Sequence, residues 1–170
     1  MRRRSTIASG RKTSRRHTLQ AAAGVAAVAA IGKAAAAAAP NVVGVWKLSG
    51  GTMTDPAGKS VGVPYGPRGM GLVSLTADGR MMAVLVDGRA KLPDGGKREY
   101  SSYCGNYTFD GTTLITTVDA ASDPARIGSQ QVRQVRFENE RMILVPPARD
   151  LDGVKIHREL SWERISTGSL

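Results

Sequence analysis

The sequence predicts an all-β protein: a small antiparallel closed barrel of roughly eight to ten strands. After residue 40 the chain consists of short, partly alternating segments separated by Gly, Asp and Pro, and no long amphipathic helical pattern follows. The first and last segments are both strand-like, and each carries one of the two tryptophans, Trp46 and Trp162. A sheet that begins and ends on such strands can protect its edges by pairing them, which closes a barrel. We expect the large ring of Trp46 to fill one end of it.

The strong positive charge of the chain belongs mostly to its N-terminal segment. The formal net charge is +10, but eight of the 24 Lys and Arg side chains fall within residues 1–39, which contain no Asp or Glu. Residues 40–170 therefore hold 16 basic and 14 acidic side chains. A nearly balanced domain has no electrostatic footprint for nucleic acid, so we expect no nucleic-acid partner.

Residues 1–39 have the pattern of a secretory signal. Basic residues ending in Arg15-Arg16 precede an uncharged run of Ala, Val, Gly and Ile over residues 21–32, and small residues follow it. The run is too short and too weakly apolar to span a membrane, which takes about 20 apolar residues. Paired arginines before a weakly apolar core resemble a bacterial twin-arginine export signal. The sequence thus predicts a signal peptide over 1–39, a domain over 40–170, no stable membrane span after signal removal, and a periplasmic or secreted location. The alternative is an Ala-rich helix or basic arm that stays attached.

The strands of the domain are expected between recognisable turns. Asp78-Gly79 and Asp110-Gly111 are hairpin signals, and Glu138-Asn139-Glu140 is a third tight turn. The expected strands are Val42–Met53, Gly69–Thr76, Met81–Val86, Tyr100–Asp110, Thr112–Val118, Gln131–Phe137, Arg141–Val145 and Val154–Ile165.

The segment Met81–Val86 contains no polar residue on either face. A strand that is apolar on both faces is expected to be buried on both. One face would line the interior, and a helix, a loop or a second subunit would cover the other, so a homodimer through Met81–Val86 is one prediction. Paired methionines suit an adaptable apolar pocket, which makes Met82 a candidate ligand contact, although core filling is the commoner use.

Other candidate ligand contacts come from aromatic residues and one arginine. Tyr103, Tyr107 and Phe109 share one face of their strand and form either barrel core or the wall of a ligand site. Tyr65 lies in a rigid Pro64-Tyr65-Gly66-Pro67 loop, where it covers a cavity mouth or packs the loop down. Arg133 is expected to point inward, with Glu163 as its ion-pair partner. The predicted ligand-binding residues are thus Tyr65, Met82, Tyr103, Tyr107, Phe109 and Arg133.

Several kinds of chemistry lack the residues they need. Outside the leader the chain has one histidine, His157, and one cysteine, Cys104, which cannot form the clusters that metal sites use. The glycines sit at hairpin turns, not between a strand and a helix, so no phosphate-binding loop is expected. Cys104 also has no partner for an intramolecular disulfide. We therefore expect no metal and no cofactor.

Six short runs follow one another along the mature chain: Gly44-Val45-Trp46-Lys47-Leu48, Pro64-Tyr65-Gly66-Pro67 with Gly69 and Gly71, Asp78-Gly79-Arg80-Met81, Tyr103-Cys104-Gly105-Asn106-Tyr107, Gly128 to Arg133, and Trp162-Glu163-Arg164. In this order they resemble the bacterial lipocalin-like domain family, small barrels related in shape to lipocalins. Relatives often have a His where this chain has Thr116-Thr117, and an aromatic where it has Ala125 after Pro124. The family has no well-defined shared activity, so the resemblance implies the fold and leaves the ligand open.

Three functions are compatible with these residues. The first is a non-catalytic barrel that binds a small, largely apolar molecule. The second is an isomerase or cyclase in which tyrosines, Arg133 or Glu163 move protons in the barrel pocket. The third is an interaction module with a filled barrel and an exposed apolar patch on the strand Met81–Val86.

Overall fold

The computed structural model describes residues 41–168, and the predicted export signal over 1–39 lies outside these described residues. Within these described residues, ten strands and one short 3-10 helix, η1 (Pro124–Arg126), follow one another. The strands are β1 (Gly44–Thr54), β2 (Ser60–Gly62), β3 (Gly69–Leu75), β4 (Arg80–Asp87), β5 (Tyr100–Phe109), β6 (Thr113–Ala121), β7 (Gln130–Glu138), β8 (Arg141–Val145), β9 (Arg149–Leu151) and β10 (Val154–Ser166). No helix in the described part of the chain is long and apolar enough to cross a membrane.

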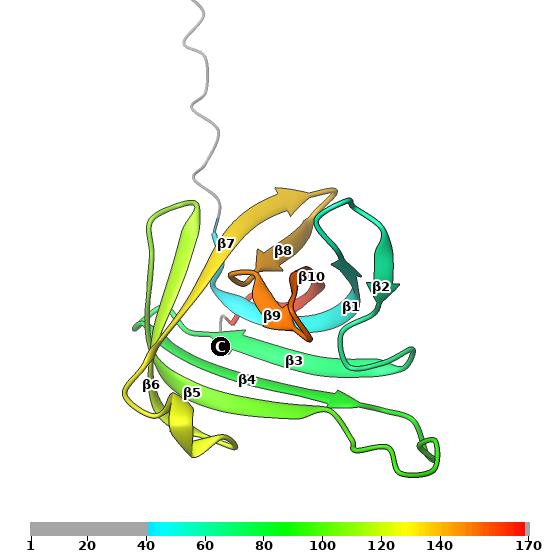
Figure 1. The fold of residues 1–170 in the computed structure, drawn as a ribbon. Helices are drawn as coiled ribbons and strands as arrows, with labels where there is room; N and C mark the ends of the chain where they lie inside the picture. Colours follow the sequence, from blue (N-terminus) through cyan, green and yellow to red (C-terminus); the bar gives the residue numbers. More distant parts are fainter. Residues whose placement is uncertain (1–40, 169–170) are drawn as a thin grey trace, which may run out of the picture. The chain divides into compact units, whose positions relative to one another are not determined.

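The strands form a closed antiparallel barrel, as the sequence predicted. Their order is β2-β1-β3-β4-β5-β6-β7-β8-β10-β9, and an additional pairing of β1 with β10 closes the sheet (Figure 1). Eight of them build the barrel, whereas β2 extends the edge of β1 and β9 extends that of β10. The closing ladder runs from Val45 opposite Ser166 to Thr54 opposite His157 and places Leu48 opposite Trp162. The two tryptophan-bearing strands therefore do meet.

A close approach of two strands fixes the path of β5. The register between β5 and β6 shifts between Cys104 and Gly105, and a Cβ atom at Gly105 would overlap the carbonyl oxygen of Thr117. Only glycine allows this approach, which bends the strand between its two inward-facing tyrosines.

The turns of the β3–β4, β5–β6 and β7–β8 hairpins lie at one end of the antiparallel barrel, which is filled by packed aromatics. Trp46 is 1% exposed there, its ring centroid lies 6.2 Å from that of Phe137, and its Nε1 donates to the carbonyl oxygen of Val42 at 2.8 Å. The guanidinium of Arg164 lies over the Trp46 ring, 4.2 Å from its centroid. Trp46 thus fills one end of the barrel, as predicted, and we call this the closed end.

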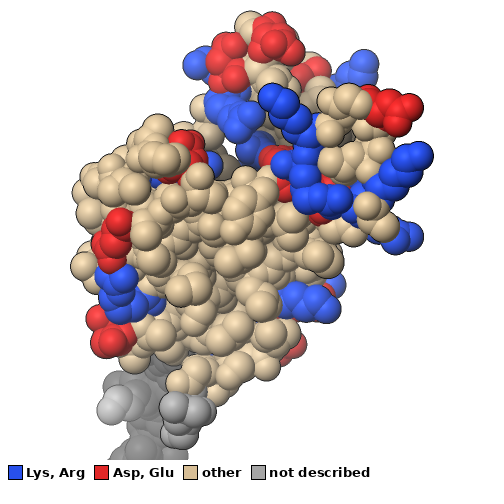
Figure 2. Space-filling model, turned by 90° about the horizontal axis from the view of Figure 1, so that it is seen from below, with Lys and Arg blue, Asp and Glu red and all other residues tan. Residues whose placement is uncertain are grey.

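The outer face of β3, β4 and β5 remains exposed in the described chain. Alternate residues of β4 point in opposite directions: Met81, Ala83 and Leu85 enter the core. Met82 and Val84 face outward and remain 57% and 39% exposed. No helix or loop among residues 41–168 covers the outer side, so the described chain by itself buries only one face of this strand, and cover by a second subunit stays a prediction. Figure 2 shows this face as a broad surface free of charged side chains, framed by Lys, Arg, Asp and Glu.

Candidate functional site

A cavity of about 210 Å³ lies inside the barrel toward the end opposite Trp46. Its inner part is apolar and is formed by side chains from four strands, β3, β4, β8 and β10: Val73, Met81, Ala83, Leu85, Leu144, Leu160 and Trp162. Its outer part is polar and basic, with side chains from loops, the helix η1 and several strands: Tyr65, Ser101, Tyr103, Arg126, Gln131, Arg133, Arg149 and Arg158. Pro146 and Pro147 complete the lining.

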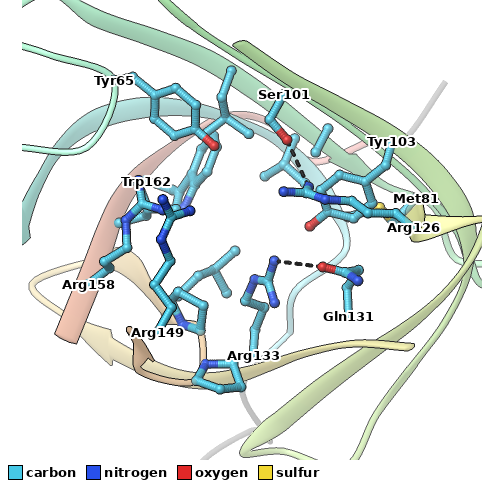
Figure 3. A pocket seen from close by; sticks show the side chains of 17 residues that line it. Tyr65, Met81, Ser101, Tyr103, Arg126, Gln131, Arg133, Arg149, Arg158 and Trp162 are labelled. Carbon is cyan, nitrogen blue, oxygen red and sulfur yellow. Dashed lines mark hydrogen bonds between the residues drawn. The ribbon is translucent and has the colours of Figure 1, made fainter. Parts of the chain in front are cut away.

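Two arginine–tyrosine pairs face each other across the mouth. The Arg126 guanidinium lies over the ring of Tyr103, 5.7 Å from its centroid, and that of Arg158 lies 6.0 Å from the centroid of Tyr65. The ring faces attract the cations and restrict their motion. Figure 3 shows the tyrosine hydroxyls and the guanidinium groups of Arg126 and Arg158 directed toward a common space.

Glu99, from the end of the β4–β5 loop, positions one side of the mouth. One of its carboxylate oxygens accepts a hydrogen bond from the backbone N–H of Tyr65 at 2.8 Å, and the other pairs with Arg158 at 2.7 Å. Tyr65 has a φ of +61°, a left-handed conformation that non-glycine residues adopt infrequently. The Glu99 carboxylate therefore supports a strained backbone position that places the Tyr65 ring at the cavity.

Arg126 is positioned by the short helix η1. Asp123 caps this helix by accepting a hydrogen bond from the N–H of Ala125 at 3.1 Å, and its carboxylate lies 3.9 Å from Arg126. Arg126 in turn donates to the hydroxyl of Ser101 at 2.9 Å. A loop residue is thereby fixed against the barrel wall.

Arg133 enters the cavity from β7, where Val135 and Phe137 follow it on the inward-facing side of the strand. It donates to the backbone oxygen of Val132 at 2.7 Å and to the Gln131 side chain at 3.4 Å. The predicted ion pair with Glu163 is wrong. Glu163 alternates with the buried Trp162 on β10, so it points outward and pairs with Arg141 at 3.0 Å.

Burial affects the acidity of Tyr65. Removal of the phenol from water raises its pKa above the ordinary value of 10.0, and the nearby Ser101 hydroxyl and Arg158 charge offset only part of this effect. The phenol therefore stays protonated at neutral pH and can donate a hydrogen bond into the cavity.

The structure brings together three of the six predicted ligand-binding residues. Tyr65, Tyr103 and Arg133 line the cavity. Tyr107 and Phe109 face inward nearer the closed end, where the Tyr107 hydroxyl donates to the backbone oxygen of Thr76 at 2.9 Å and Phe109 packs against the core. Met82 lies on the outer face of β4 and does not line this cavity, because the pleat turns its neighbours Met81 and Ala83 inward.

Sequence reasoning missed three arginines of the mouth, Arg126, Arg149 and Arg158. Arg126 lies in the short helix η1 and Arg149 in the three-residue strand β9. The alternation of side chains along a strand does not predict side-chain directions in segments of this kind. Arg158 and Trp162 are four residues apart on β10, so the period of two along a strand was a usable signal for this one.

Metal-binding groups do not gather in the described residues. No three His, Cys, Asp or Glu side chains lie close enough together within residues 41–168 to hold an ion. Among the residues that line the cavity, the polar groups are hydroxyls, an amide, an indole N–H and guanidinium groups. Such a set can bind and orient an organic molecule through hydrogen bonds.

An eight-stranded antiparallel barrel that is packed at one end and encloses a cavity toward the other belongs to the class of small β-barrels that can hold one small ligand. Comparison with protein families agrees with this class: residues 43–165 match the lipocalin-like domain, so the chain belongs to the lipocalin-like domain family. A search of curated proteins gives no match.

Proposed function

We propose that this chain is a binding protein that holds one small organic molecule in the barrel cavity and performs no chemistry on it. The cavity carries this proposal, because it combines an apolar inner wall with hydrogen-bonding groups at its mouth, as small-molecule sites commonly do. Its volume of about 210 Å³ is below the range of about 300–1,000 Å³ that is usual for drug-sized ligands. The ligand is therefore compact, with an apolar body against Leu85, Leu144 and Trp162.

Two observations favour binding over the alternative of an isomerase or cyclase. Glu163, one of the groups that such an enzyme was expected to use, lies outside the barrel. Tyr65 holds its proton more tightly than an ordinary phenol, so it is suited to donating a hydrogen bond and poorly suited to acting as a base.

A cavity-filling variant tests the proposed site. Ala83 lines the cavity, whereas its neighbour Val84 faces outward. We expect Ala83→Leu to occupy the space and to abolish binding of small aromatic and aliphatic probes, followed by tryptophan fluorescence, while Val84→Leu leaves binding unchanged. Equal binding by both variants, or no binding of any probe by the folded wild type, would contradict the proposal.

We also propose that a second copy of the chain covers the outer face of β3, β4 and β5. The exposed residues on the outward side of these paired strands are Met70, Leu72, Met82, Val84 and Tyr100. Contiguous apolar patches of this kind mark interaction sites. Because the face carries no charges, two copies can bury it against each other in a two-fold pair without removing a charge from water or bringing like charges together. Sedimentation analysis should show a dimer that Val84→Lys dissociates and that Gln134→Lys, on the outer side of β7, leaves intact. A wild type that is monomeric at all concentrations tested would refute this pairing.

Export through the twin-arginine route remains a proposal that rests on the residues of 1–39. We expect replacement of Arg15 and Arg16 by Lys to keep the chain in the cytoplasm, and replacement of Arg3 and Arg4 by Lys to leave export intact. Equal export of both variants in a host with a functional twin-arginine system would argue against this route.

A further inference from the structure

The polar groups of the cavity are unbalanced: they offer many hydrogen-bond donors and few acceptors. Four arginines and one indole N–H can only donate, and no Asp or Glu is among the 17 residues that line the cavity. Hydroxyl groups and the Gln131 amide supply the acceptors. A ligand that satisfies this lining has to bring acceptors of its own.

The positive charge of the lining is only partly neutralised by the surrounding protein. Glu99 pairs with Arg158, and the Asp123 carboxylate lies at the longer distance of 3.9 Å from Arg126. No carboxylate of residues 41–168 lies within 4.0 Å of the guanidinium groups of Arg133 or Arg149. Two of the four cations therefore remain available for an anion that enters the cavity.

A second, independent observation comes from the inner wall. Trp162 is 1% exposed, its indole borders the cavity, and no described protein group accepts a hydrogen bond from its buried Nε1. Buried donors are nearly always paired, and one without a partner calls for an explanation. The other tryptophan gives the contrast, because Nε1 of Trp46 donates to Val42.

The apolar wall and the small volume limit the rest of the ligand. Leu85, Leu144 and Leu160 border the same space as Trp162. They exclude a purely polar anion such as inorganic phosphate as the best ligand, because such an ion would leave this apolar surface unfilled. The remaining class is an apolar body that carries one acidic head group.

We infer that the ligand is a small organic acid, whose anionic head group is held by Arg133, Arg149 and the Trp162 indole N–H and whose apolar body lies against the leucines of the barrel wall. This inference rests on the proposed binding function and specifies its ligand class. Arginine is well suited to the role, because its planar fork can donate two hydrogen bonds to one carboxylate. The contacts with Tyr103 and Tyr65 hold Arg126 and Arg158 at the mouth, so these side chains lose less conformational entropy when a ligand binds.

The test compares acids with neutral amides of matched shape. The full chain, labelled with ¹⁵N, is titrated with benzoate and benzamide, phenylacetate and phenylacetamide, and hexanoate and hexanamide, together with benzylphosphonate to separate carboxylate from phosphonate head groups. Two indole N–H signals report the result, and Trp162→Phe assigns them. At least one acid should saturate the site at a concentration about tenfold or more below that of its amide, since hydrogen bonds to charged groups are stronger than neutral ones. It should move the Trp162 signal and leave the Trp46 signal in place.

Charge-removing variants locate the head group. Arg133→Met should weaken acid binding by about 10- to 100-fold, the range expected for a lost charge-assisted hydrogen bond, and leave amide binding unchanged. Arg149→Met, on the exposed strand β9, should act in the same direction and serves if Arg133→Met does not fold. Arg141→Met removes an arginine that pairs with Glu163 outside the barrel and should change neither affinity.

The outcomes separate this inference from the proposed function. If amides bind as tightly as acids, or if the arginine variants weaken both equally, the cavity is a binding site but not one for acids, and the inference is refuted. If no compound moves the Trp162 signal of the folded protein, the binding function fails together with it.

Discussion

A matched pair of substitutions, Trp46→Phe and Trp162→Phe, tests how the two tryptophans hold the barrel. Both side chains are 1% exposed, so each change removes a similar buried volume. Only Trp46 loses a hydrogen bond within the protein, because its Nε1 donates to Val42 at 2.8 Å, whereas Nε1 of Trp162 has no acceptor among the described groups.

The expected difference follows from the contacts of Trp46. Leaving the buried Val42 carbonyl without its donor costs about 1–3 kcal/mol. The contact of Arg164 with the indole, at 4.2 Å from its centroid, belongs to a class worth about 0.5–2 kcal/mol, and phenylalanine retains part of it. Trp46→Phe should therefore reduce the free energy of unfolding by about 1–4 kcal/mol more than Trp162→Phe does.

Equilibrium urea unfolding of the full chain, followed by far-ultraviolet circular dichroism, measures this difference without depending on the fluorophores that the substitutions remove. Comparable m values for the two variants are required for the free energies to be compared. If Trp162→Phe costs as much stability as Trp46→Phe, Nε1 of Trp162 has a strong partner in the folded protein, and the account of both tryptophans is wrong.

Three further predictions follow from local geometry. Gly105→Ala should prevent folding or lower the free energy of unfolding by more than about 3 kcal/mol, because its Cβ would overlap the Thr117 carbonyl oxygen. At Gly50 a Cβ would meet no atom within 4 Å, so Gly50→Ala should keep the free energy of unfolding within about 0.5 kcal/mol of the wild type. Thermal unfolding of the two variants distinguishes these outcomes. Burial raises the pKa of Tyr65 above 10.0, so the unfolded chain loses this proton at a lower pH than the folded protein does. The free energy of unfolding should therefore fall above about pH 10. Urea unfolding at pH 8 to 12 should show a smaller fall for Tyr65→Phe than for the wild type. Backbone N–H groups of the β5–β6 turn lower the pKa of Asp110 below its ordinary 3.8. Its ionised carboxylate should therefore stabilise the fold above that pH, and this stabilisation should be lost as the pH falls through the lower pKa of the folded state. Asp110→Asn should lack this part of the loss of stability in acid, and an unchanged dependence of stability on pH below about pH 4 would contradict the assignment.

Simple alternation explains both a success and an error of the sequence analysis. Tyr103, Tyr107 and Phe109 were placed on one inward face because side chains alternate along a strand. The same rule, applied from Trp162, turns Glu163 outward and excludes it as a partner of Arg133. The segment Met81–Val86 has no polar residue that could mark an exposed face, so the sequence alone left open whether the side of Met82 and Val84 is covered.

The sequence by itself determined the barrel and its closure, because hairpin turns, alternating segments and two terminal tryptophan strands are local signals that each narrow the topology. It also placed Tyr65, Tyr103 and Arg133 among the candidate contacts. Only the tertiary structure decided that the cavity mouth is basic. Arg126, Arg133, Arg149 and Arg158 come from a 3-10 helix and three different strands, and closing the barrel brings them to one end. Charge that is nearly balanced along the domain is unevenly distributed in space, because four arginines line the cavity and no Asp or Glu side chain does.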